Sequence, residues 1–238
     1  MPSPRLSGRV ALVTGASRGL GAAVAERLAA EGAHVVLIAR TVGGLEELDD
    51  RIKAAGGSAT LIPQDLADHA KLDVLGPALH DRFGRLDILV GNAAHAGFIG
   101  PVAHADPKQW ERTFAVGVTA NMRLIRTLHP LLQASDAGRA IFVTDRVGRE
   151  PTAYWNAYAA AKAALEQMVR TYAAETAKGR LRVNLVDPGP MATALREKIF
   201  PGEPSGTQAA PATLAPAIAD LAAPDCDRHG ALINLQGA

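Results

Sequence analysis

The residues best suited to chemistry are Tyr158 and Lys162, which lie four positions apart in a stretch of helical character. Side chains at this spacing lie on the same face of a helix, so the two groups would be neighbours. Free tyrosine titrates at about pH 10, and a nearby positive charge favours its deprotonated form. The pair could therefore exchange a proton with a carbonyl or alcohol oxygen near neutral pH.

A second chemical element lies far upstream, in the glycine-rich turn that spans residues 15–21. Glycine permits tight turns and close approach to phosphate, and a helix N-terminus offers unpaired N–H groups and a positive dipole end. The turn has an apolar run before it and a helical pattern after it, which is the context that such a motif requires. It predicts a pyrophosphate site, and together with the tyrosine–lysine pair it suggests hydride transfer with a nicotinamide dinucleotide.

The elements that would position these groups follow from an alternation of short apolar runs and longer helical stretches. Continuously apolar strands are buried on both faces, and helical crossovers imply parallel pairing. The pattern predicts an α/β protein with a single doubly wound Rossmann domain over residues 1–238, with about seven parallel strands and helices on both faces. We expect strands over residues 10–13, 35–38, 59–62, 86–90, 139–144, 181–186 and 231–235. We expect helices over residues 20–31, 45–55, 71–83, 107–132, 156–178 and 212–222. Residues 200–211, rich in proline and glycine, are either a mobile flap or a plain surface loop.

Charge, cysteine content and the N-terminal segment indicate which partners, compartment and metals to expect for this chain. The 238 residues carry 25 basic and 24 acidic side chains, a net charge of +1, so we expect neither nucleic acid nor a membrane as a partner. The single cysteine, Cys226, cannot form an intrachain disulfide and fits a reducing compartment. The N-terminal segment lacks the apolar core of a signal peptide, which makes the cytoplasm the expected location. No histidine or cysteine spacing suits zinc, so no metal site is expected.

Several motifs, in order along the chain, resemble those of the short-chain dehydrogenase/reductase family from about Gly8 to the last residue. The glycine spacing is G-x-x-x-G-x-G, and the other matching motifs are Tyr158-x-x-x-Lys162, Asp65-Leu66, Asn92-Ala93-Ala94, and Pro188-Gly189 with Thr193. The resemblance implies that Tyr158 is the acid/base and that Lys162 tunes it and binds the cofactor ribose.

The same resemblance implies a set of cofactor contacts. Asp65 should meet the adenine amine and Leu66 should pack near the ring. Ala94 stands where the family usually has glycine. The expected contacts are Gly15, Ser17, Arg18, Gly19, Leu20, Gly21, Arg40, Thr41, Asp65, Leu66, Asn92, Ala93, Ala94, Tyr158, Lys162, Pro188, Gly189 and Thr193.

The second expected strand ends at Arg40, where a site that prefers NAD usually has an acid for the ribose 2′-hydroxyl. Arg18 lies inside the glycine turn. Two guanidinium groups near a 2′-phosphate would form charge-assisted hydrogen bonds. The sequence therefore predicts NADP(H) in preference to NAD(H).

Two expected catalytic positions depart from the family pattern. The family has a serine thirteen residues before the tyrosine, where this chain has Asp145, and an asparagine where it has Gly117. Ionised aspartate has no proton to donate, would repel a developing alkoxide and would raise the pKa of Tyr158. Three interpretations remain open: a buried, protonated Asp145 donates, an ionised Asp145 binds a cationic or hydroxyl-bearing ligand, or the chain is a weakened enzyme. Asp187 likewise replaces a frequent asparagine.

Two functions follow. The first is an NADP(H)-dependent oxidoreductase that interconverts a carbonyl and an alcohol on a small organic substrate. The second is a catalytically weak or inactive NADP(H)-binding sensor or scaffold of the same fold, which the residues at positions 117 and 145 favour and the intact tyrosine–lysine pair opposes. The resemblance also implies a homodimer or homotetramer, assembled through the two long helices and the last strand.

Overall fold

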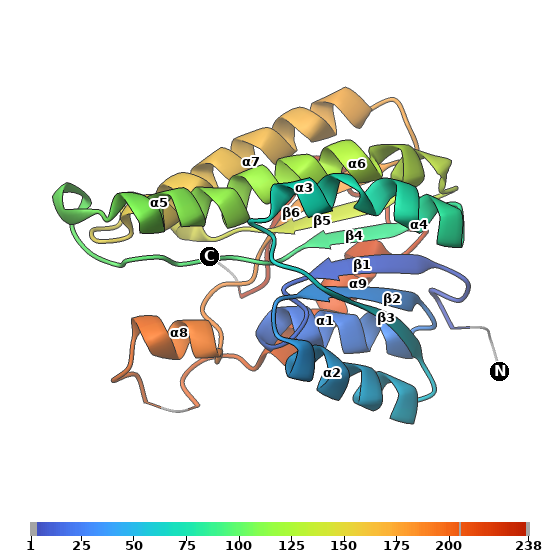
Figure 1. The fold of residues 1–238 in the computed structure, drawn as a ribbon, viewed down its shortest axis with the longest axis horizontal. Coiled ribbons are helices and arrows are strands. Elements are labelled where there is room, and N and C mark those ends of the chain that lie inside the picture. The colour runs from blue at the N-terminus through green and yellow to red at the C-terminus, as the bar shows by residue number, and fades with distance from the viewer. Residues whose placement is uncertain (1–3, 205, 237–238) are drawn as a thin grey trace.

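The computed structural model of the chain describes residues 4–204 and 206–236 and shows a central sheet between two layers of helices (Figure 1). The sheet has seven strands in the order β3-β2-β1-β4-β5-β6-β7, and every neighbouring pair is parallel. The predicted fold class is confirmed. The strands are β1 Val10–Thr14, β2 His34–Ala39, β3 Ser58–Pro63, β4 Ile88–Gly91, β5 Arg139–Val143, β6 Arg182–Asp187 and β7 Leu232–Asn234.

The apolar strands bury side chains on both faces because each face packs against its own helices. Val13 and Leu37 belong to a core shared with α1, α2 and α9, whereas Leu12 and Val36 belong to a core shared with α4, α6 and α7. Figure 1 shows these two helical layers on opposite sides of the sheet. The helices are α1 Gly19–Ala30, α2 Val42–Ala54, α3 His69–Asp73, α4 Leu75–Phe83, α5 Pro107–Phe114, α6 Ala120–Ala134, α7 Asn156–Thr176, α8 Ala194–Ile199 and α9 Pro211–Ala222.

The order of the strands creates a crevice. The chain builds outward from β1 to β3 and then returns to place β4 on the other side of β1. The connections that leave β1 and β4 therefore diverge at the carboxyl edge of the sheet. Ligands of doubly wound folds bind at this switch point.

The structure divides two of the predicted helices. The helix expected over residues 107–132 is interrupted by a π-helical turn, η2 (Ala115–Thr119), before it continues as α6. Gly117 lies in this turn, where its low helix propensity weakens the regular pattern. The helix expected over residues 71–83 is split at Val74 into α3 and α4. The short helix α8 and two 3₁₀ turns, η1 (Val102–His104) and η3 (Arg146–Gly148), were not predicted.

Within residues 4–204 and 206–236, no helix combines the length and the apolar character needed to cross a bilayer. The same residues contain no group of three histidine, cysteine or acidic side chains arranged to hold a metal ion.

Candidate active site

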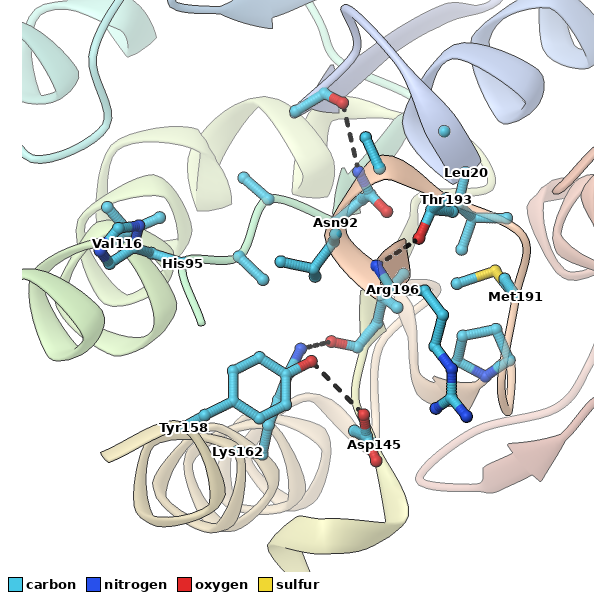
Figure 2. Close-up of a pocket in the computed structure, with 18 of the residues that line it drawn as sticks. Leu20, Asn92, His95, Val116, Asp145, Tyr158, Lys162, Met191, Thr193 and Arg196 are labelled. Carbon is cyan, nitrogen blue, oxygen red and sulfur yellow. Dashed lines mark hydrogen bonds between the residues drawn. The ribbon is translucent and has the colours of Figure 1, made fainter. Parts of the chain in front are cut away.

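A cavity of about 530 Å³ opens at the carboxyl edge of the sheet and gathers most of the predicted site residues (Figure 2). Segments far apart in the sequence meet there because each follows the carboxyl end of a parallel strand. The predicted residues that line it are Gly15, Ser17, Arg18, Gly19, Leu20, Arg40, Thr41, Asp65, Leu66, Asn92, Ala93, Ala94, Asp145, Tyr158, Lys162, Pro188, Gly189 and Thr193. Gly21 and Gly117 are the two predicted residues that do not line it.

The glycine turn has the backbone form that a phosphate site needs. Gly15 and Gly19 have φ angles of 66° and 58°, which favour glycine. Helix α1 begins at Gly19 without a side-chain cap and without an acidic residue in its first turn. Its N-terminal N–H groups are therefore available to an anion.

Gly21 serves packing rather than direct contact with the cavity. A Cβ atom at this position would lie 2.3 Å from the Gly15 carbonyl oxygen and 2.6 Å from the Asn92 side-chain nitrogen. The glycine thus lets α1 approach the end of β1 closely. Asn92 donates from its side-chain amide to the Thr14 carbonyl oxygen at 2.9 Å, which ties the ends of β1 and β4 together.

Two arginines line the cavity without forming an ion pair to a described residue. Arg18 and Arg40 are exposed, and neither forms an ion pair with any residue that the structure describes. The residues present fit a phosphorylated dinucleotide, because an uncapped helix N-terminus and two free guanidinium groups share one cavity.

Arg112 is a member of this site that the sequence did not reveal. It extends from α5 and donates to Asp65 Oδ2 at 2.6 Å. Partial burial acts against ionisation, but the Arg112 hydrogen bond, a backbone N–H and the nearby Arg40 hold the pKa of Asp65 below its usual value. The two residues are 47 positions apart, so no local pattern could have indicated the pair.

Tyr158 and Lys162 lie on α7 and are buried, with 7% and 6% of their surface exposed. The Lys162 ammonium donates to the Val143 carbonyl oxygen at 2.8 Å and lies 5.4 Å from the Tyr158 ring centroid. The Tyr158 hydroxyl points to Asp145 and donates to Oδ2 at 3.4 Å (Figure 2). Burial, and then the Asp145 charge, raises the pKa of Tyr158 well above its usual value. Burial lowers the pKa of Lys162.

Asp145 caps the N-terminus of η3, and its Oδ1 accepts from the Val147 N–H at 3.2 Å. The adjacent Thr144 is turned away, since its hydroxyl donates to Glu166 Oε1 at 2.7 Å. Successive residues of an extended strand point to opposite faces, so the Thr144 hydroxyl does not take the place of the Asp145 carboxylate beside Tyr158.

Gly117 faces α7 rather than the cavity. A Cβ atom there would lie 3.6 Å from the Ala161 Cβ, and its carbonyl oxygen accepts from the Asn121 side chain at 2.9 Å. The Gly117 carbonyl oxygen therefore has a side-chain partner within the helix.

An ion network that contains two buried carboxylates adjoins the cavity. Arg149 donates to Glu166 on α7 and to Asp187 at the end of β6. Side chains of Glu166 and Asp187 are 6% and 8% exposed. Arg149 therefore compensates two buried carboxylates, one of which, Asp187, lines the cavity.

The segment that contains α8 closes the cavity from the other side. Phe200 lies 6.1 Å, between ring centroids, from Trp155, and Trp155 lies 5.4 Å from Tyr158. Arg196 stacks 4.0 Å over Phe200 and donates twice to Glu203, at 2.7 and 2.8 Å. The cavity therefore has an aromatic wall close to the Tyr158 hydroxyl.

Comparison with known proteins agrees with this geometry. The sequence model of the family described as short chain dehydrogenase matches residues 9–204. The uncharacterized oxidoreductase YciK of Escherichia coli (strain K12) is 35% identical over 214 residues, which cover 89% of this chain and 84% of that protein. A short chain dehydrogenase from Shigella flexneri 2a str. 301, solved with NADP, is 33% identical with a TM-score of 0.94, covering 99% of this chain and 100% of the other. One from Escherichia coli CFT073, solved with NADPH, is also 33% identical, with a TM-score of 0.93 and full coverage of both chains.

Proposed function

The chain belongs to the short-chain dehydrogenase family of oxidoreductases, and on that premise we propose that it uses NADP(H) to interconvert a carbonyl and an alcohol on a small organic molecule. The observation that carries the proposal is the placement of the buried tyrosine–lysine pair and the glycine turn in one cavity. We further propose that residues 1–238 act as one NADP-binding domain.

Each residue has a role in this proposal. The α1 N-terminus holds the pyrophosphate, Arg18 and Arg40 hold the 2′-phosphate, and Lys162 anchors the ribose. A bound reduced nicotinamide would supply hydride to the carbonyl carbon. Tyr158 gives its hydroxyl proton to the carbonyl oxygen during reduction and takes it back during oxidation. The aromatic wall excludes water from the reacting atoms.

The preference for NADP(H) is supported by the two arginines without ion pairs and by the solved relatives that contain NADP or NADPH. No acidic side chain of the described chain is bonded to either arginine, so both are available to a phosphate. The 2′-hydroxyl of NAD(H) carries no charge to interact with the two arginines, so NAD(H) should bind less tightly than NADP(H) at the same site.

The deciding experiment is a titration of the protein with NADPH and NADH by cofactor fluorescence, followed by NADPH consumption with a panel of ketones and aldehydes. We expect tighter binding of NADPH and turnover of at least one panel member. Failure to bind either dinucleotide would remove the proposal.

A second function, an NADP(H)-binding sensor or scaffold, is favoured by one observation, the Asp145 carboxylate beside the Tyr158 hydroxyl. Tight NADPH binding without turnover on the panel would support it. Asp145→Ser separates the two, because a serine hydroxyl can donate to the substrate oxygen. We expect this variant to reduce ketones faster than wild type by about tenfold or more. Slower reduction by a variant that still binds NADPH would contradict the role assigned to this position.

We also propose that the protein forms a homodimer or homotetramer. A shallow groove between α6 and α7, with Met122, Ile125 and Met168 in its lining, supports an interface on the long helices. Light scattering of the purified protein gives the mass that decides this.

A further inference from the structure

Three carboxylates line the cavity in the part of the chain that the structure describes, namely Asp65, Asp145 and Asp187. In all three aspartates, one of the two carboxylate oxygens is held by the same kind of hydrogen bond. In each, Oδ1 accepts from the backbone N–H two residues ahead, at 2.9, 3.2 and 3.0 Å respectively. These local turns fix each side chain at the carboxyl end of its strand.

The second oxygen of two of these carboxylates accepts from an arginine. Asp65 Oδ2 accepts from Arg112 at 2.6 Å, and Asp187 Oδ2 accepts from Arg149. Each negative charge therefore has a fixed positive partner within the protein.

The second oxygen of Asp145 differs. It faces the cavity, and its single partner among the described residues is the Tyr158 hydroxyl at 3.4 Å, a long hydrogen bond. No ion pair to Asp145 is present within residues 4–204 and 206–236. One oxygen of a partly buried carboxylate is thus available to a ligand.

The cations nearest to Asp145 are already engaged. Lys162 donates to the Val143 carbonyl oxygen. Arg196 is near enough for the Asp145 charge to raise its pKa, but the hydrogen bonds to Glu203 contribute more. The charge of Asp145 acts on both Lys162 and Arg196, but neither of them forms an ion pair with it.

The surroundings of the free oxygen suit a cation. The ring of Trp155 lines the same cavity and lies 5.4 Å from the Tyr158 ring centroid. Arg196 lies over Phe200 and Lys162 near Tyr158, whereas no cation of the described residues lies over Trp155. An aromatic face beside a carboxylate attracts ammonium and iminium groups. A ketone oxygen at the same place would meet an acceptor instead of a donor.

We propose that this site accepts a protonated imine, R₂C=NHR⁺, with the iminium N–H donating to Asp145 Oδ2. The inference rests on the proposed hydride-transfer function and names the class of acceptor that the altered residue selects. It assigns Asp145 as a substrate-binding residue and resolves the open choice between a proton donor, a cation ligand and a lost function.

The reaction balances without proton donation by the protein. A bound reduced dinucleotide would supply the hydride of the new C–H bond, and the C=N π pair would become the nitrogen lone pair. The products are R₂CH–NHR and the oxidised dinucleotide. Asp145 keeps the imine in its protonated, more electrophilic form. The raised pKa of Tyr158, which makes it a weaker acid toward a ketone, has no such consequence for an acceptor that already carries its proton.

The test is an equilibrium measurement that needs no turnover. Piperidinium carries a positive charge at pH 7, and tetrahydropyran has the same ring with an oxygen in place of the nitrogen. Each is titrated by calorimetry into protein saturated with NADPH. We expect piperidinium to bind more tightly by about tenfold or more, as for a hydrogen bond to a charged group. Equal affinity of the two ligands would overturn the proposal.

Two variants locate the effect. In Asp145→Asn the advantage of piperidinium should fall by about tenfold, while the Kd for NADPH stays unchanged. In Asp227→Asn, which neutralises an exposed aspartate before β7, the advantage should persist. An advantage that survives Asp145→Asn would overturn the assignment to Asp145. The comparison of the two ligands on wild-type protein decides the inference even where the Asn variant fails to fold.

An activity measurement then separates this inference from the proposed function. With NADPH, wild type should reduce 1-piperideine faster than cyclohexanone, and Asp145→Ser should reverse the order. Reduction of cyclohexanone in preference to 1-piperideine would leave the proposed oxidoreductase intact and overturn the choice of imine. Absence of NADPH binding would instead remove the proposed function itself.

Discussion

An aspartate at the amino edge of the sheet and one at the carboxyl edge differ in how many of their hydrogen-bond partners the protein supplies. At the amino edge, Asp87 precedes β4 and is fully buried, and both of its oxygens accept hydrogen bonds, from Arg9, Arg85, Ser135 and the Val10 N–H. These bonds join β4 to the segments that precede β1 and β5. The carboxylate is fully compensated and has no capacity left for a ligand.

At the carboxyl edge, Asp145 follows β5 and has one oxygen directed into the cavity, with a long hydrogen bond from Tyr158 as its single described contact. Removing one partner of a compensated buried charge destabilises the fold, whereas an uncompensated charge beside a cavity costs stability unless a ligand binds it. The contrast teaches that the amino edge joins the strands, whereas the carboxyl edge keeps an acceptor open to the proposed ligand.

The sharpest test of this contrast is Tyr158→Phe, which removes only a hydroxyl at the carboxyl edge. Ketone reduction should fall by about 100-fold to 10,000-fold, because the alkoxide loses its proton donor. The Kd for NADPH and the urea midpoint should match wild type. NADPH consumption, cofactor fluorescence and urea titration measure the three quantities, and ketone turnover within a few-fold of wild type would refute the role of Tyr158.

The reciprocal test is Asp87→Ala at the amino edge. It leaves Arg9 and the Val10 N–H without their buried acceptor, and the free energy of unfolding should fall by about 3 kcal/mol. Urea denaturation measures the loss, while kcat of the folded fraction should be unchanged. Asp136→Ala is the matched control, because Asp136 also bonds Arg9 but is 73% exposed, and it should cost at most about 1 kcal/mol. Equal losses in the two variants would contradict the structural role of burial at this edge.

The substitution Arg40→Ala tests the proposed contact between Arg40 and the 2′-phosphate of the cofactor. The Kd for NADPH should rise by about tenfold, since one charge-assisted contact to the 2′-phosphate is lost. The Kd for NADH should stay the same. Fluorescence titration gives both constants, and Arg51→Ala, on the exposed side of α2, serves as the control. A similar rise for both dinucleotides would show that Arg40 does not discriminate between them.

The smallest expected effect is a shift in pH dependence. During alcohol oxidation Tyr158 accepts the proton, so the rate rises with pH as the phenol ionises. Burial and the Asp145 charge both raise the pKa of Tyr158. Asp145→Ser removes the second cause, so the pKa falls and the rising limb moves to lower pH. The profile of kcat/KM with NADP⁺ and a secondary alcohol measures the limb, and a limb that moves to higher pH would contradict this coupling.

The sequence predicted the sheet well because its strands are buried on both faces. Runs such as Val10–Val13 are continuously apolar, and only helices on both sides of a parallel sheet can cover them. Helix interruptions were harder to predict. The π-helical turn at residues 115–119 contains Gly117, which faces Ala161 of α7, and the regular apolar spacing of the sequence does not indicate such a turn.

The sequence indicated the residues of the glycine turn and of the tyrosine–lysine pair because each set forms a local motif. The glycine turn and the tyrosine–lysine pair each lie within a few positions of one another, so spacing alone indicates their geometry. Arg112 on Asp65 and Arg149 on Asp187 were missed, since those pairs join residues 47 and 38 positions apart.

The sequence by itself determined the parallel sheet, the glycine turn and the presence of a carboxylate thirteen residues before Tyr158, because these depend on local pattern and spacing. Only the tertiary structure decided which of the three aspartates at the cavity keeps an oxygen free. That outcome depends on which carboxylates the side chains of Arg112 and Arg149 reach. The interaction of two charges is set by the distance between them in space, and their separation along the chain does not determine this distance.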